Sequence, residues 1–421
     1  MLQAASVHGG NGRPDAPEHL RHALGTGRAG ASPLTHRGLR VTLSVGAPLG
    51  TLGMGQGGYK IARALYHDGA ELRVICTGSQ PGLLPAECLQ ILDLRPVERV
   101  LLPWASRLWS GGALAAMNNL FDWQASRQLG PTDLLYAYSD QALWTMRAAH
   151  RHGAVTVLHA ANTHIRAMVG ELHTEARLHG LRQGWVSTWT VRKVEREYAE
   201  ADWIRVQSRL VRDSLIAHGV PAEKILFIPP AVDLERFRWA RPADDVFRVA
   251  FVGSFDLRKG IHYLLRAWDA AALPRSELIL HGGAGSRFMN RLLAPYRSRA
   301  DVRFRGGDPA PTYAEASVCV VPSIEDGFAY VVLEALASGC PVIVTEQVGA
   351  KDAVRDGENG YVIPARDVTA LRDRLVALHR MSERRHAMER AARAMAERYS
   401  FAAEQRALGT VLRSIGARHA M

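Results

Sequence analysis

The residues best suited to chemistry lie around position 330. Asp326 and Glu334 stand eight positions apart, and the turn Gly327-Phe328-Ala329 lies between them. Carboxylate oxygens accept hydrogen bonds from sugar and ribose hydroxyls. Free backbone N–H groups at the start of the helix expected from Phe328 onward suit a diphosphate. Two acids beside a helix start therefore suit a ligand that carries both hydroxyl and phosphate groups.

Two adjacent cations complement these acids. Arg258 and Lys259 follow the apolar segment 247–252, which indicates a strand. Fixed cations stabilise negative charge that builds on a phosphate leaving group, and two of them can take the place of a metal ion there. We therefore expect a site that needs no metal ion. The alternative is an ordinary solvated turn, since loops of this kind are often charged.

A glycine-rich segment at 53–58 has the spacing GxGxxG before an expected helix. Backbone N–H groups at such a place suit a phosphate, so we assign Gly57 and Gly58 to donor contact. Dinucleotide-binding proteins use the same spacing, but the next expected strand, 72–76, is followed by Thr77-Gly78 and lacks the acid that holds a ribose. NAD binding and a purely structural loop stay open as alternatives.

Two histidines follow the apolar segment that ends near position 159. His159 stands at the expected strand end and His164 lies five residues later. Ligands of open α/β sheets bind outside the carboxyl ends of the strands, so both are candidate catalytic residues, with His159 preferred. A buried structural histidine is the alternative for each.

The elements that position these residues alternate between short apolar strands and helices. This alternation predicts an α/β fold with two doubly wound parallel sheets. The 421-residue chain is also long enough for two domains. We expect the following parts: a disordered extension at 1–38, an N-terminal Rossmann-like domain at 39–240, a C-terminal Rossmann-like domain at 245–395, and a terminal helix at 396–421 that packs back on the N-terminal domain.

The stretch Val320–Val342 resembles the donor motif of the family-four glycosyltransferases. In that family two acids eight apart flank a Gly-Phe-Gly turn and are followed by small-Gly-x-Pro-Val. The resemblance implies a GT-B fold, with two Rossmann-like domains facing a central cleft, the acceptor on 39–240 and the donor on 245–395. It also implies hexosyl transfer with retention of configuration, in polysaccharide or glycoconjugate biosynthesis.

The resemblance assigns roles within the site. It implies that Glu334 holds the ribose, Asp326 the hexosyl group and Lys259 the diphosphate, while a histidine near His159 approaches the reacting sugar. The sequence departs from the family at Ser254, where Arg is usual, at Asp326, where Glu is usual, and at Ala329, where Gly is usual. Because of these departures, a catalytically weakened homologue that binds sugar nucleotides stays an alternative. A NAD-dependent oxidoreductase is a less favoured alternative.

The resemblance implies as partners a UDP- or GDP-linked sugar, which acts as co-substrate without a further cofactor, and a glycan or lipid-linked acceptor. The net charge is +11, and no nucleic-acid motif occurs. Residues 98–129 combine aromatic and basic side chains: Arg99, Trp104, Arg107, Trp109, Phe121, Trp123 and Arg127. This composition suits contact with an anionic membrane, although a buried amphipathic segment is the alternative. We expect a cytoplasmic protein, peripheral at the inner membrane surface where this contact forms.

Overall fold

The computed structural model describes residues 38–51, 53–94, 112–181, 186–240, 242, 244–283 and 286–419. Nearly all of the expected extension 1–38 lies outside the described residues, as do positions 98–111 of the aromatic and basic segment 98–129.

The N-terminal half forms a parallel sheet of seven strands in the order β3-β2-β1-β4-β5-β6-β7. Its strands are β1 (Arg40–Leu49), β2 (Glu71–Ser79), β3 (Leu89–Ile91), β4 (Leu134–Tyr138), β5 (Val155–Ala160), β6 (Trp203–Val206) and β7 (Ile225–Phe227). Its helices are α2 (Met54–His67), α4 (Gly112–Gln128), α5 (Leu143–Arg151), α6 (Ile165–Leu178), α7 (Thr188–Glu200) and α8 (Arg209–Ala217). The strand order reverses between β1 and β4, which are neighbours and in register at Val41 and Leu134.

The C-terminal half repeats this plan with a parallel sheet of six strands in the order β10-β9-β8-β11-β12-β13. The strands are β8 (Phe247–Val252), β9 (Ser276–His281), β10 (Val302–Arg305), β11 (Val318–Val321), β12 (Val342–Thr345) and β13 (Gly360–Ile363). The helices are α9 (Ile261–Ala271), α10 (Arg287–Leu293), α11 (Ala310–Glu315), α12 (Tyr330–Ala337), α13 (Val368–Arg380), α14 (Ser382–Ala396) and α15 (Phe401–His419). Here the order reverses between β8 and β11.

The strands are continuous apolar runs because helices cover both faces of each sheet. Strand β4 is buried at every position, as are β11 and β12. Two clusters of buried side chains line each sheet, one on each face. The predicted fold class, two Rossmann-like parallel-sheet domains, is confirmed.

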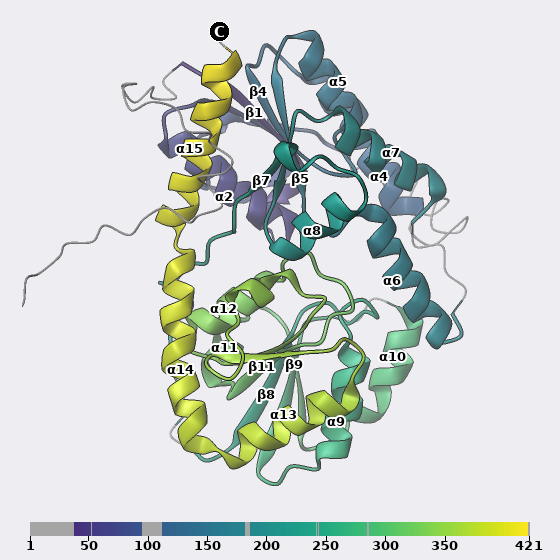
Figure 1. The fold of residues 1–421 in the computed structure, drawn as a ribbon, viewed down its shortest axis with the longest axis vertical. Coiled ribbons are helices and arrows are strands. Elements are labelled where there is room, and N and C mark those ends of the chain that lie inside the picture. Colours follow the sequence, from purple (N-terminus) through teal and green to yellow (C-terminus); the bar gives the residue numbers. More distant parts are fainter. Residues whose placement is uncertain are drawn as a thin grey trace, which may run out of the picture. The chain divides into compact units, whose positions relative to one another are not determined.

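The two last helices belong to different cores (Figure 1). Helix α14 packs against α12, whereas α15 contacts α2 and places Leu408, Val411 and Ile415 in the core of the N-terminal sheet. A buried ion pair fixes α15 there, because Arg205 of β6 donates to Glu404 at 2.7 Å. Helix α15 thus follows the C-terminal sheet in the chain but packs on the N-terminal half.

Candidate donor site

The acidic loop joins β11 to α12 at the carboxyl end of the C-terminal sheet. Ala329 caps α12 with a left-handed backbone, φ 63°, a conformation that costs little only for glycine. Gly327 lies so close to the N-terminal half that an added Cβ would stand 1.9 Å from the carbonyl oxygen of Ala161. Ser208, which caps α8, donates its hydroxyl to the Gly327 carbonyl at 2.7 Å. The loop therefore touches the ends of two N-terminal strands.

Lys259 and Asp326 form an ion pair at this loop. Burial alone would raise the pKa of the Asp326 carboxyl, but the positive charges of Lys259 and Arg258 outweigh burial and lower that pKa. Asp326 is accordingly an anion at neutral pH. The sequence analysis placed both residues in the donor site, and the structure brings them into direct contact.

Arg258 points to a different partner. Its guanidinium donates to the backbone carbonyl of Glu325 at 3.2 Å and lies 3.4 Å from the Glu325 carboxylate. The other oxygen of that buried carboxylate accepts from the backbone N–H and the hydroxyl of Thr163, at 3.1 and 3.0 Å. Arg258 therefore supports a bridge between the donor loop and the end of β5.

Glu334 lies on α12 and is 8% exposed. Burial raises the pKa of its carboxyl, and this rise is opposed by a hydrogen bond from the Tyr313 hydroxyl at 2.8 Å and by the charge of Lys60. Lys60 is itself buried on α2, where it donates to the carbonyl of Ala231 at 2.7 Å and lies over the ring of Tyr330. The Lys60 cation thus links α2 to α12, the helix that carries Glu334.

The glycine-rich segment 53–58 is mostly helical, not the loop that the sequence predicted. The sequence analysis expected a loop before the helix, but α2 already begins at Met54, because Gly53 adopts φ 78° and turns the chain into it. The N–H of Gly57 is consequently bonded within the helix, to the Gly53 carbonyl at 3.1 Å. Gly57 instead leaves room for the hydroxyls of Tyr138 and Tyr330, and Gly58 packs on Val45.

The side chain of His159 lies in the interior of the N-terminal half and is 1% exposed. Its Nδ1 lies 3.1 Å from the Tyr136 hydroxyl, and its ring stacks on Tyr138 with centroids 4.4 Å apart. Burial, reinforced by the charge of Arg205, holds the imidazole pKa well below its usual value, so the ring is neutral. Its Nε2 has no hydrogen-bond partner among the described residues.

His164 caps helix α6. Its side chain accepts from the backbone N–H of Arg166 at 3.3 Å, and its ring stacks on His218 with centroids 4.2 Å apart. Burial and the neighbouring His218 lower its pKa to about 4. These contacts match the structural alternative for this residue, and a part in the reaction stays a prediction.

The segment between the two histidines was not singled out from the sequence. Ala161 and Asn162 contact Gly327, and Thr163 binds Glu325. Gln207, at the end of β6, donates to the hydroxyl of Tyr330 at the start of α12. The only signal for these residues was their place after apolar strands, at the edge where ligands of such sheets bind.

One group of side chains in the described part of the chain could hold a metal ion: Glu175, His179 and His262. These side chains bond to each other, with Glu175 accepting from His262 at 2.8 Å, and Arg366 binds the second Glu175 oxygen at 2.8 Å. The group joins α6 to the C-terminal half and includes no residue of the donor loop. Metal independence of the reaction therefore stays a prediction.

The aromatic and basic segment is described only in part. Arg99, Trp104, Arg107 and Trp109 lie outside the described residues. On α4, Phe121 is buried in the core, while Trp123 is 48% exposed with Arg127 over its ring. None of the helices in the described ranges has the length and apolar character needed to cross a membrane.

Two family models match parts of this chain. A family model described as glycosyl transferases group 1 matches residues 246–381, and one described as Glycosyltransferase Family 4 matches 53–236. A D-inositol 3-phosphate glycosyltransferase of Saccharomonospora viridis is 30% identical over 342 residues, which cover 73% of this chain and 74% of that protein. One from Xylanimonas cellulosilytica is 27% identical, covering 87% of this chain and 94% of that protein.

Solved structures show the same fold. Sucrose-phosphate synthase from Thermosynechococcus elongatus superposes with a TM-score of 0.66 at 18% identity, covering 90% of this chain and all of that one. Anabaena HepE in complex with UDP-glucose gives 0.64 at 19% identity, covering 89% and 100%. The paired sheets and the loop between β11 and α12 define a GT-B glycosyltransferase. The chain belongs to the family of group 1 glycosyl transferases, also called glycosyltransferase family 4.

Proposed function

We propose that this glycosyltransferase moves a hexosyl group from a UDP-linked sugar to a hydroxyl of a polar acceptor, with retention of configuration. The observation that carries the proposal is the Lys259–Asp326 ion pair at the strand ends of the C-terminal sheet, on the loop that leads into the helix of Glu334. A cation for the diphosphate and two carboxylates for hydroxyls stand where ligands of such sheets bind.

The choice of UDP rests on relatives of the fold. The Anabaena protein was solved with UDP and with UDP-glucose. In this chain, Glu334 would accept from the ribose hydroxyls and Asp326 from the hexosyl group, and the N–H group of Ala329 would face the diphosphate. Gly57 lies opposite Tyr330 and completes that side of the site. A GDP-linked sugar is the second donor to test.

The chemistry would be a direct transfer on one face of the sugar. The bond from the anomeric carbon to the diphosphate breaks, the acceptor oxygen bonds to that carbon, and the acceptor proton passes to the departing phosphate. Arg258 and Lys259 would stabilise the charge left on the phosphate. No carboxylate is assigned as a nucleophile, because Asp326 is paired with Lys259 and Glu334 with Tyr313. The neutral, buried state of His159 favours positioning of the sugar over proton transfer.

Inositol 3-phosphate is the first candidate for the acceptor, because the relatives described above are D-inositol 3-phosphate glycosyltransferases. A glycan or lipid-linked acceptor in glycoconjugate biosynthesis is the second, with membrane attachment through residues 98–129. Thr163 and Asn162, beside Gly327, would border the acceptor hydroxyl that reacts.

The experiment is a transfer assay with a panel of donors and acceptors. UDP- and GDP-linked glucose, N-acetylglucosamine and mannose are each combined with inositol 3-phosphate, hexoses and a polyprenyl phosphate sugar, without added metal. We expect release of nucleotide and an acceptor whose mass increases by one hexosyl unit. Tight binding of a nucleotide sugar without transfer to any acceptor would favour the sugar-nucleotide-binding homologue instead.

A further inference from the structure

The N-terminal sheet has its own reversal of strand order, between β1 and β4. In open α/β sheets this point opens a crevice outside the carboxyl ends of the strands, where ligands bind. The donor loop occupies the equivalent point of the C-terminal sheet, after β8 and β11. In the N-terminal half, β4 is followed by Ser139 and then by Asp140 and Gln141. Gln141 reaches Met54 at the start of α2, with Nε2 2.9 Å from the sulfur.

Asp140 has an unusual backbone. Its φ of 72° lies in the left-handed region, which residues other than glycine seldom adopt and which persists only where the surroundings impose it. Two side chains of α7 impose it here. Glu197 accepts from the Asp140 N–H at 2.6 Å, and Lys193 donates to the Asp140 carbonyl at 2.9 Å.

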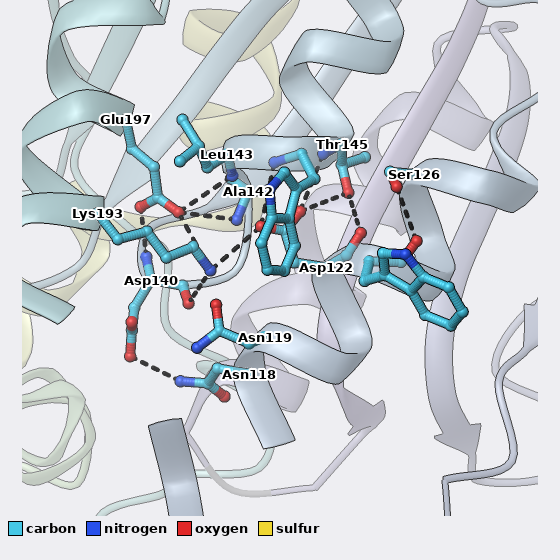
Figure 2. A network of polar contacts seen from close by, with 12 residues as sticks. Asn118, Asn119, Asp122, Ser126, Asp140, Ala142, Leu143, Thr145, Lys193 and Glu197 are labelled. Atoms are coloured by element: carbon cyan, nitrogen blue, oxygen red, sulfur yellow. Dashed lines mark hydrogen bonds and ion pairs between the residues drawn. The ribbon is translucent and has the colours of Figure 1, made fainter. Parts of the chain in front are cut away.

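These two side chains belong to a buried charge cluster, shown in Figure 2. Lys193 lies 3.1 Å from Asp122 of α4 and 3.7 Å from Glu197, and all three side chains are at most 2% exposed. Glu197 also accepts from the backbone N–H groups of Ala142 and Leu143, at 3.0 and 3.1 Å. Burial raises the pKa of Glu197 to about 7, although Lys193 opposes that rise. Helices α4, α5 and α7 thus cooperate to fix the short loop after β4.

The side chain of Asp140 is less completely satisfied than its backbone. Its Oδ2 accepts from Asn118 at 2.7 Å, but its Oδ1 is covered and has no hydrogen-bond partner among the described residues. The side-chain oxygens of its neighbours Gln141 and Asn119 also lack partners, and Gln141 is 1% exposed. Buried acceptors without donors are rare in folded proteins, and each calls for a reason.

A hydroxyl-bearing ligand supplies that reason. Alcohol groups donate hydrogen bonds, and acceptors that lack donors gather beside Asp140. Burial also raises the pKa of the Asp140 carboxyl, against the effects of Asn118 and Lys193, and a donated hydroxyl would relieve the cost of burying this group. Because Glu197 and Lys193 hold the Asp140 backbone, little conformational entropy is lost when the Asp140 carboxylate binds a ligand.

We propose that Asp140, positioned by Lys193 and Glu197 and supported by Asn118, binds a hydroxyl of a polyhydroxylated acceptor, a cyclic polyol or a sugar. This inference rests on the proposed function and adds the acceptor side to it. Strand β4 is hydrogen-bonded to β5, and the residues after β5 contact Gly327 of the donor loop. Adjacent strands are about 4.8 Å apart, so a ring held at Asp140 would extend toward the donor.

Two substitutions test the proposal without a backbone penalty. Asp140→Asn keeps the shape, and Asp140→Gly suits φ 72° better than aspartate does. Asp373→Asn, an exposed carboxylate paired with its neighbour Arg372, is the matched control. For each folded variant we would measure the Kd of UDP and the KM of the best acceptor from the transfer panel. We expect unchanged UDP binding, an acceptor KM raised about ten- to a hundredfold by both Asp140 variants, and no change in the control.

A binding measurement separates this idea from the proposed function. Saturation-transfer NMR would follow myo-inositol 3-phosphate and glucose as probes, in the presence of UDP. We expect wild-type contact with at least one probe, lost in both Asp140 variants, even where the panel yields no transfer. An acceptor KM unchanged by both substitutions overturns the proposal. So does a wild type that binds UDP but neither probe.

Discussion

Thr163 donates both its backbone N–H and its hydroxyl to one oxygen of Glu325, at 3.1 and 3.0 Å. The two residues come from the two different sheets, 162 positions apart in the chain. Through this contact the loop that carries the donor motif is fixed to the end of β5, beside the residues that we place next to the acceptor. Loss of this contact should therefore affect the alignment of donor and acceptor more than the binding of either.

The first prediction concerns Glu334. Replacing it by alanine removes the proposed ribose ligand, so we expect kcat/KM for the donor to fall at least about a hundredfold, the effect of losing charge-assisted hydrogen bonds. The change also leaves the buried Tyr313 hydroxyl without its acceptor, at a cost of about 1–3 kcal/mol in stability. Thermal unfolding must show a folded variant before kinetics are compared. Glu277→Ala, which removes a carboxylate paired with Arg303, is the control. Near wild-type donor kinetics for Glu334→Ala would show that Glu334 does not bind the donor.

The second prediction concerns Gly327. An alanine there would place its Cβ 1.9 Å from the Ala161 carbonyl oxygen, so the donor loop would have to move away from the N-terminal half. We expect transfer to be nearly abolished, while UDP binding changes less than tenfold because the cations remain. Gly283→Ala serves as the control, since an added Cβ at Gly283 meets nothing within 4 Å. Full activity of Gly327→Ala would show that the contact with Ala161 is dispensable.

The third prediction compares the two histidines. His159 stands at the end of a strand with its Nε2 unpaired among the described residues, whereas the contacts of His164 are those of a helix cap. We expect His159→Ala to lower kcat by at least about tenfold and His164→Ala to lower it less. Steady-state kinetics at saturating donor decide between them. A larger loss for His164→Ala would reverse the assignment.

The fourth prediction uses the pKa of His164, which is lowered to about 4. The unfolded chain binds a proton at this residue near its ordinary pKa of about 6.5, while the folded protein does not. Its neutral state therefore contributes stability above about pH 6.5, and this contribution is lost as the pH falls toward 4. Urea unfolding at several pH values should show a shallower loss in His164→Gln than in the wild type. An equal or steeper loss in the variant would contradict this.

The fifth prediction concerns metal ions. Arg258 and Lys259 provide positive charge at the donor loop, so we expect transfer to continue in EDTA. Activity abolished by EDTA and restored by Mg²⁺ or Mn²⁺ would refute this. Glu175→Gln would then show whether the ion acts through the Glu175, His179 and His262 group, which joins α6 to the C-terminal half.

The sequence predicted the donor loop well because its residues are nearly contiguous. A strand, a turn and a helix already place Asp326 and Glu334 at one sheet edge, whatever the rest of the chain does. The start of α2 was misplaced because glycines suggest a loop, while in the structure their lack of side chains allows close packing against Tyr138 and Val45. Local composition does not reveal such packing.

Other features depend on tertiary structure and could not be predicted. The hydrogen bond from Thr163 to Glu325 spans 162 positions. The two side chains that hold the Asp140 backbone belong to α7, which begins 48 residues later, at Thr188. No sequence pattern predicts that an aspartate will adopt a positive φ, as Asp140 does. Arg258 was assigned to the diphosphate from its type and position, but its hydrogen bonds go to Glu325, a choice that only packing decides.

The central claim is that the nucleotide sugar binds at the Lys259–Asp326 pair, and calorimetric titration with UDP tests it most directly. The wild type should bind one UDP per chain. Lys259→Ala should weaken that binding at least about tenfold, and Lys224→Ala, which removes a lysine bound to the carbonyls of Ala199 and Ala201, should leave it unchanged. Equal UDP affinity in the wild type and a folded Lys259→Ala variant would contradict the account.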